Sequence, residues 1–235
     1  ENPYLTLNKE YEADELRLFA DIVEKGFVYR GKKPIYWSIP ARTALAEAEV
    51  EYHDHVSQSV FVKFPVVGRP GVNIAIWTTT PWTLPGNLAV AYNSTFNYSL
   101  VRVGEEQFIV SAMLLSAVAE KCGWTNYTQT PVSADELARL ENQNPFYNRN
   151  GNLFPGDNFV TNDTGTGFVH IPPGPGVDDY NLGRQHGLPI YSPVNDDGAR
   201  ADGFHLLEDV RRHDDRLVLR HLGDERSDVV LLVGV

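Results

Sequence analysis

The sequence predicts a mixed α/β fold that is rich in β-strands. Three observations support this prediction. Apolar residues recur at every second position over 60–64 and 72–77, which is the period expected of strands. The apolar runs 98–103 and 107–110 flank the turn 104–106, a hairpin signal. Helical periodicity is confined to a few separate stretches.

These stretches and the remaining elements follow in chain order. Helices are predicted at 12–25, 112–121, 134–140 and 178–186, and three of them end beside a glycine. Short strands are predicted at 27–29 and 35–37, around a basic turn, and at 88–92. The Ala and Glu content of 42–52 favours a helix by propensity alone. Residues 124–158 are polar, and we expect them to be mostly loop.

Composition limits the class of protein. The 235 residues are 42% hydrophobic and 22% charged, as in globular proteins. No apolar run reaches membrane-spanning length and no signal peptide opens the sequence, so we expect a cytoplasmic location. The single cysteine, Cys122, leaves no intramolecular disulfide and fits a reducing compartment. A net charge of −11 argues against a broad nucleic-acid surface, so such a role needs a local patch or other domains.

The most informative stretch runs from Trp77 to Asn87 and contains four threonines next to two prolines. Pro81 has no N–H, so the preceding strand is expected to stop before it. The hydroxyls of Thr78, Thr79, Thr80 and Thr83 then lie at the mouth of a strand, on a stiffened loop. Such a loop suits a small polar substrate, although threonine is also simply a good strand residue.

A second informative stretch, 165–180, joins glycines and prolines to His170 and Asp179. The glycines allow tight turns and close backbone approach. Asp178 is expected to cap the following helix, which leaves Asp179 free for a ligand. Taken alone, His170 could equally be a core histidine and Asp179 a solvated complement to the helix dipole.

Both stretches resemble one family. The sequence Trp77-Thr78-Thr79-Thr80-Pro81-Trp82-Thr83-Leu84-Pro85-Gly86-Asn87 is similar to the threonine-rich editing loop of isoleucyl-tRNA synthetases, whose valyl and leucyl relatives typically have Arg-Pro after the threonines. Residues 165–180 resemble the second active-site motif of that editing domain. Residues 29–37 are similar to the segment that leads into it from the catalytic fold. The family usually has His where this chain has Pro175.

The resemblance covers residues 2–198 and implies a domain organisation. Residues 1–42 would be a flank of the catalytic nucleotide-binding fold with its linker. Residues 43–200 would be the editing domain, with a β-barrel-like core and peripheral helices, and 42–52 would be extended rather than helical. After about residue 200 the resemblance fades, and residues 201–235 would be an atypical tail of unclear structure, through truncation or foreign origin.

The family ligates isoleucine to its tRNA with ATP and Mg, which belong to its catalytic domain. This chain has neither the HIGH-type nor the KMSKS-type signature nor a P-loop, so we expect it to form no aminoacyl-adenylate. Isoleucine and valine differ by one methylene, this family's well-known problem of discrimination, which editing solves. The implied activity is hydrolysis of mischarged valyl-tRNA(Ile), without a cofactor. The implied partners are the 3′ end of tRNA(Ile) and the rest of the synthetase, with no membrane.

The resemblance also assigns roles. Asp179 would bind the α-ammonium group of the amino acid, a charge-assisted contact. His170 would line the side-chain pocket and help to exclude isoleucine. The predicted catalytic residues are Thr79, Thr80, Asn87 and Asp179, and the predicted substrate-binding residues are Trp77, Thr78, Thr83, His170 and Asp179. Asn87 could instead be an Asx-turn residue.

Two alternatives stay open at this point. No Ser-His-Asp arrangement is evident, so hydrolysis by a positioned water is favoured over a protein nucleophile. The segment His53-Asp54-His55 and the pair Asp178/Asp179 carry metal-ligating atoms, but their spacing fits no known motif and no metal site is predicted. A non-catalytic module that binds tRNA or a synthetase partner is the rival to the hydrolase.

Overall fold

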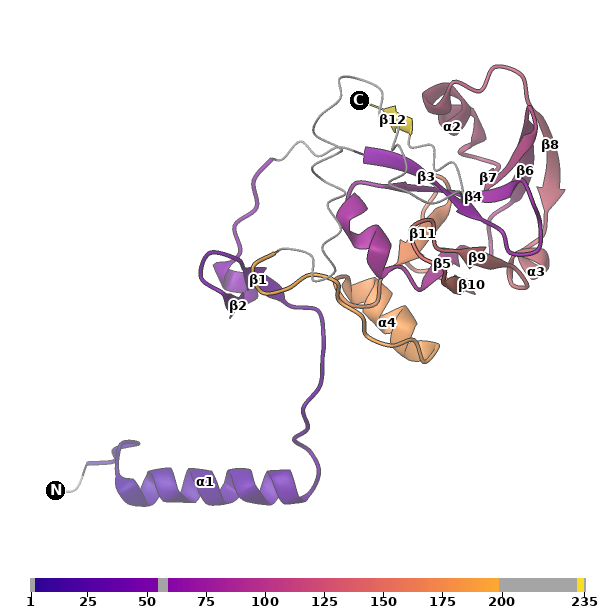
Figure 1. Ribbon diagram of the computed structural model, residues 1–235. Coiled ribbons are helices and arrows are strands. Elements are labelled where there is room, and N and C mark those ends of the chain that lie inside the picture. Colours follow the sequence, from indigo (N-terminus) through magenta and orange to yellow (C-terminus); the bar gives the residue numbers. More distant parts are fainter. Residues whose placement is uncertain (1–2, 55–58, 199–231, 235) are drawn as a thin grey trace. The chain divides into compact units, whose positions relative to one another are not determined.

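The computed structural model describes residues 3–54, 59–198 and 232–234, the last three as backbone only. The chain divides into two units, residues 1–33 and 34–235 (Figure 1). The first contains helix α1 (Lys9–Glu24), which begins three residues before the predicted start and has no buried residue. Lys25 caps its end, and Gly26 follows with a φ of +75°, a left-handed conformation that glycine adopts without strain.

The second unit begins with a short antiparallel pair. Strands β1 (Tyr36–Ser38) and β2 (Thr43–Leu45) pair with each other and are followed by the 3₁₀-helix η1 (Glu47–Glu49). Residues 42–52 are therefore mostly extended with one short turn, rather than the α-helix that their composition favoured. The strand predicted at 27–29 is wrong, because these residues form no regular element and β1 pairs with β2 instead.

The larger sheet has six strands in the order β12-β3-β4-β7-β6-β8. Its strands are β3 (Ser59–Pro65), β4 (Val72–Thr78), β6 (Tyr98–Val103), β7 (Glu106–Ser111), β8 (Thr128–Val132) and β12 (Leu232–Gly234). The predicted hairpin is confirmed as β6 and β7. Strand β4 pairs with β3 in antiparallel and with β7 in parallel orientation, so it lies inside the sheet.

The smaller sheet has four strands in the order β11-β5-β10-β9. Its strands are β5 (Ala89–Tyr92), β9 (Glu141–Gln143), β10 (Asn150–Pro155) and β11 (Phe168–Ile171). An isolated bridge between Val66 and Asn142 links the two sheets. Both orders are open, so the described strands form no closed barrel, and the mixed, β-rich α/β class is confirmed.

Three helices lie on the outside of these sheets: α2 (Leu115–Cys122), α3 (Ala134–Leu137) and α4 (Val177–Gln185). Helix α2 packs Leu115 and Val118 on one face of the large sheet. Helix α4 packs Leu182 against Ile171 on the outer face of the small sheet. The predicted loop 124–158 also contains β8, β9 and β10, so that prediction was largely wrong.

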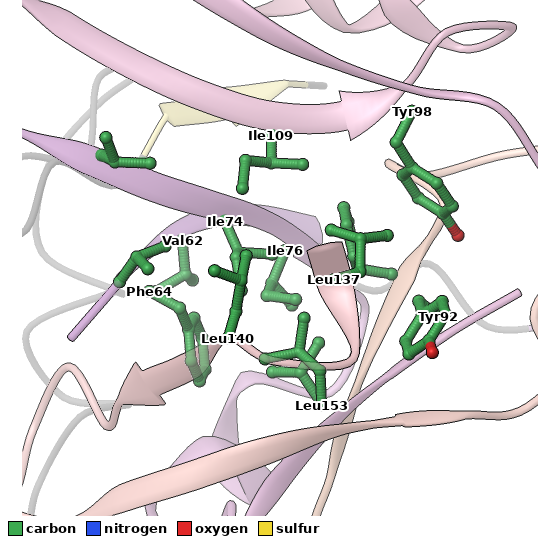
Figure 2. Packing of buried hydrophobic residues seen from close by; sticks show 14 of the residues in the cluster. Val62, Phe64, Ile74, Ile76, Tyr92, Tyr98, Ile109, Leu137, Leu140 and Leu153 are labelled. Carbon is green, nitrogen blue, oxygen red and sulfur yellow. The ribbon is translucent and has the colours of Figure 1, made fainter. Parts of the chain in front are cut away.

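The main core lies between the two sheets (Figure 2). Ile74 and Ile76 of β4 point into it with Leu153 of β10. The alternate residues Ala75 and Trp77 face the α2 side instead. Strand β4 is thus buried on both faces rather than on one, and each large side chain buried here contributes about 2 kcal/mol to stability.

Candidate functional site

The threonine loop begins where β4 ends, at Thr78. The ladder stops there as predicted, and the chain turns into the 3₁₀-helix η2 (Pro81–Gly86), which has proline at its first position. The Thr78 hydroxyl accepts a hydrogen bond from the Thr80 N–H at 3.1 Å and lies 3.3 Å from the Thr80 hydroxyl. These bonds fix the turn that leaves Thr79 and Thr80 exposed at the end of a rigid strand.

A hydrogen-bonded chain connects this loop to His170 of β11. The Thr83 oxygen lies 2.8 Å from the Thr80 carbonyl oxygen and 2.7 Å from His170 Nε2. Two oxygens at that distance need a proton between them, so the Thr83 hydroxyl donates to the carbonyl and accepts from Nε2–H. We therefore assign the Nε2–H tautomer to His170, with Nδ1 as an acceptor. Burial lowers the pKa of His170 to about 4, so the ring is neutral at pH 7.

A cavity of about 430 Å³ opens in front of this loop. One wall is the threonine loop, with Trp77, Thr78, Thr79, Thr80, Trp82 and Thr83. The other wall comes from 159–176 and from the first turn of α4, and includes His170 and Asp179. The structure thus brings together every predicted site residue except Asn87.

Among the residues that line this cavity, only His170 and Asp179 have an acidic or basic side chain. Burial raises the pKa of the Asp179 carboxyl to about 7, and the neighbouring charge of Asp178 adds to this rise. The carboxylate folds back over Gly176, where a Cβ would overlap it, so a side chain at that position would displace the carboxylate. No side chain or backbone N–H of the described residues donates a hydrogen bond to the Asp179 carboxylate, so a bound cation would stabilise its ionised form.

The expectation that Asp178 caps α4 is wrong. The N-cap residue is Gly176, and it makes no side-chain cap. Asp178 lies exposed in the first helical turn, where its negative charge complements the helix dipole. The two neighbouring carboxylates therefore have different environments: Asp178 faces solvent, and Asp179 faces the cavity.

Comparisons with known proteins identify the family of the chain. The model of the family described as "tRNA synthetases class I (I, L, M and V)" matches residues 1–194. The chain belongs to this family. Over 233 residues it is 43% identical to the isoleucine–tRNA ligase of Lactobacillus acidophilus, covering 95% of this chain and 25% of that protein. The corresponding ligase of Microcystis aeruginosa is 42% identical, covering 93% and 24%.

The chain therefore spans about a quarter of the length of the curated synthetases that it matches. The resemblance to isoleucyl-tRNA synthetases found in the motifs is confirmed by these relatives. One similar solved structure is the editing domain of the P. falciparum cytosolic leucyl-tRNA synthetase, with a TM-score of 0.47 and 13% identity, covering 56% of this chain and 67% of that one.

Within this synthetase domain, Asn87 lies behind the loop and is not among the residues that line the cavity. It is 2% exposed, and its side-chain oxygen accepts the N–H of Ile171 at 2.9 Å. The backbone Leu88 N–H bonds to the Ile171 carbonyl at 2.9 Å. Asn87 thus fastens the end of the threonine loop to β11, the strand that carries His170.

Sequence reasoning missed part of the synthetase cavity. Thr161 and Thr164 add two hydroxyls to the wall opposite the threonine loop, and Phe159 and Val160 add apolar surface. The polar, glycine-ended run 161–165 was the available signal. This loop is held by the Ser111 hydroxyl, which donates to the side-chain oxygen of Asn162 at 2.7 Å.

The described residues include no group of three or more side chains suited to a metal ion. His55, one of the metal-ligating candidates, lies outside the described residues. The cavity lining has no Lys or Arg, so it has no obvious cradle for a phosphate. No helix in the described part of the synthetase chain is long and apolar enough to cross a membrane.

Proposed function

We propose that this chain carries the post-transfer editing site of an isoleucyl-tRNA synthetase and hydrolyses the ester of mischarged valyl-tRNA(Ile). The observation that supports this most is the pairing of two walls in one cavity: hydroxyl groups on one side and the carboxyl group of Asp179 on the other. A volume of about 430 Å³ lies within the range of small-molecule sites.

Asp179 is suited to the α-ammonium group of an aminoacyl ester. A half-buried carboxyl without a cation holds its proton more tightly, which is why its pKa rises to about 7. An ammonium group placed beside it favours the ionised form, so binding releases a proton below that pH. The contact is charge-assisted and fixes the amino acid by the group that every such ester shares.

His170 is suited to limit the size of the amino-acid side chain. It is 6% exposed, and its bond to Thr83 holds the ring in one orientation. A rigid ring can exclude one additional methylene, whereas a mobile one would move aside. This is the physical basis for admitting valine and rejecting isoleucine.

The chemistry we propose is attack by a positioned water. Its oxygen adds to the ester carbonyl carbon, the bond from that carbon to the ribose oxygen breaks, and the ribose oxygen leaves with the proton that the water loses. Thr79 and Thr80 hold the water and the substrate in place. His170, with a pKa of about 4, is a poor base at pH 7, so the vicinal hydroxyl of the ribose is the favoured proton relay.

The remaining components belong to the rest of the synthetase. A chain with a net charge of −11 holds the body of a tRNA weakly, so we assign that contact to segments outside this chain. ATP and Mg serve the aminoacylation reaction in the catalytic domain. The site described here uses no cofactor in this proposal.

The test is single-turnover deacylation with the chain in excess over valyl-tRNA(Ile), and isoleucyl-tRNA(Ile) measured in parallel. We expect valine release at least about tenfold above the rate with heat-inactivated protein, and little isoleucine release. Binding of tRNA without any release of valine would instead identify the chain as a non-catalytic binding module.

A further inference from the structure

A segment that the synthetase motifs do not include lies behind the threonine loop. Asn144 Nδ2 lies 3.4 Å from the carbonyl oxygens of both Leu84 and Asn87. Arg149 Nη2 donates to the carbonyl oxygen of Pro85 at 2.6 Å. Three carbonyls at the end of η2 are thus contacted by the segment 144–149.

Two of these carbonyls, those of Pro85 and Asn87, need partners from elsewhere, whereas the Leu84 carbonyl already accepts the Asn87 N–H within the turn. The last turn of a helix leaves its C=O groups without an intrahelical N–H, and η2 is only six residues long. They also form the negative end of the helix dipole, where a cation is favourable. Arg149 supplies both the N–H donor and the positive charge.

The guanidinium group of Arg149 is itself held by stacking. It lies 5.6 Å from the ring centres of both Tyr147 and Tyr191. Its Nε is buried and has no hydrogen-bond partner among the described residues, so the two rings rather than further bonds to Nε set its plane. Lysine cannot reproduce this planar contact.

Tyr191 connects this clamp to the opposite wall. Its backbone carbonyl lies against Gly174, where a Cβ would overlap it, in the turn that leads to Asp179. Two residues further on, Pro193 lies against Gly86 at the end of η2, where a Cβ would come within 3.3 Å of it. The segment stacked on Arg149 therefore packs against both segments that form the cavity walls, at Gly174 and Gly86, which do not themselves line the cavity.

We propose that Arg149 is a positioning residue for the editing reaction, which holds η2 so that Thr83 keeps its bonds to Thr80 and His170. Pro85 lies two residues after Thr83 in the same short helix, so a shift at Pro85 moves the Thr83 hydroxyl. The inference rests on the proposed function, because it concerns the rate of that hydrolysis. Arg149 does not line the cavity, so it acts through the loop and touches no substrate.

The experiment compares Arg149→Met, Arg149→Lys and the control Arg102→Met, which removes an exposed arginine on β6. We expect Arg149→Met to lower the maximal single-turnover deacylation rate by about tenfold. The protein concentration that gives half of this rate should change by no more than about twofold, since misplacement affects the reacting geometry more than binding. Arg149→Lys recovers part of that loss, and Arg102→Met keeps the wild-type rate.

Amide hydrogen exchange gives a readout that is independent of activity. The Thr83 and Asn87 N–H groups bond within η2, to the carbonyls of Thr80 and Leu84. We expect both to exchange about tenfold faster in Arg149→Met, with the amides of β6 and β7 unchanged. Wild-type rates and exchange in Arg149→Met would overturn the proposal.

Two further outcomes are decisive. If the amides of Arg149→Met exchange faster throughout the core, the fold itself is weakened and Arg149→Lys becomes the deciding variant. A lowered deacylation rate in Arg149→Lys with a protected core supports the proposal, and a wild-type deacylation rate overturns it. If the unmodified chain releases no valine, the proposed function fails. The exchange of Thr83 and Asn87 then still tests whether Arg149 holds η2.

Discussion

The two walls of the cavity differ in how their polar groups are satisfied. On the threonine loop, the side chains of Thr78 and Thr83 have hydrogen-bond partners within the domain. On the opposite wall, the carboxyl group of Asp179 has no bond from the described residues, and its pKa is raised to about 7. The Thr78 and Thr83 hydroxyls are paired without a ligand, although the buried Trp77 Nε1–H of the same wall is not, and the carboxyl group of Asp179 has no bond from a described residue.

This difference separates two tasks. A wall with satisfied hydrogen bonds is preorganised, so it does not have to rearrange during the reaction. A half-buried carboxylate without a partner destabilises the free protein but gains most when a cation binds beside it. The comparison suggests that the threonine wall provides geometry and the Asp179 wall provides binding energy.

Removing the charge of the second wall should have the largest effect. We expect Asp179→Ala to lower valyl-tRNA deacylation by about a thousandfold, because the ester loses its anchor and its alignment with water. The matched control is Asp178→Ala, which removes an exposed carboxylate of the same helical turn and should keep the rate within about threefold. Deacylation and thermal unfolding are measured on both. A nearly normal rate in Asp179→Ala would make its anchoring role wrong.

The same carboxyl should govern the pH profile. Burial, with Asp178 adding to it, raises the pKa of Asp179 to about 7, and only the ionised form binds ammonium. The pH dependence of kcat/KM reports the pKa values of groups in the free enzyme. We therefore expect kcat/KM to rise about tenfold per pH unit from pH 5 and to level off near pH 7. Above about pH 8 the α-ammonium loses its proton and the profile falls. A flat profile between pH 5 and pH 7 would contradict this.

Removing the ring that hydrogen-bonds to the threonine wall should affect selection more than rate. His170→Ala opens the pocket and frees the Thr83 hydroxyl from its 2.7 Å bond. We expect the ratio of isoleucyl- to valyl-tRNA deacylation rates to increase by about tenfold, which is the lower end of the discrimination that a pocket achieves for one methylene. His186→Ala is the control, because that ring stacks on Phe154 and does not line the cavity. An unchanged ratio in His170→Ala would assign the histidine to the core alone.

The smallest effect concerns stability. A carboxyl whose folded pKa lies above its unfolded value of 3.8 contributes stability at low pH and loses it as pH rises through 7. Asp179→Asn has no such dependence. After allowance for partial exposure, we expect it to be about 1 kcal/mol more stable than the wild type at pH 8 and no more stable at pH 4.

Urea midpoints at the two pH values measure this difference. The pKa of His170 is lowered to about 4, so its own contribution is present above pH 6.5 and lost as pH falls toward 4. This change is common to both proteins and cancels in the comparison. Equal midpoints at pH 8 would mean that the Asp179 wall carries no unmet charge.

The accuracy of the sequence predictions follows the range of the interactions. Strands β3 and β4 were predicted from alternation, and the end of β4 from Pro81, because both signals are local. Strand β10 was missed because its sequence, Asn150–Pro155, has no apolar alternation and is set by pairing with β5 and β9. Burial of β4 on both faces likewise depends on helix α2 and the second sheet, which no local pattern reports.

The site shows the same division. The threonine loop and residues 165–180 were recognised as contiguous motifs, and the structure brings them to one cavity. Arg149 belongs to no such motif, because its role depends on the carbonyl of Pro85, 64 residues away in the chain. Asp178 was predicted as a cap from its position next to the glycine-rich turn, but the helix begins one residue earlier, at Val177.

The parallel pairing of the small sheet has a consequence for how the domain folds. Strand β5 meets β10 and β11, which lie about sixty and eighty residues later in the chain, and closing such long loops is slow. The threonine loop precedes β5 directly, whereas His170 arrives with β11. We therefore expect the cavity to be among the last features to assemble, so that hydrolytic activity would report completed folding rather than mere collapse.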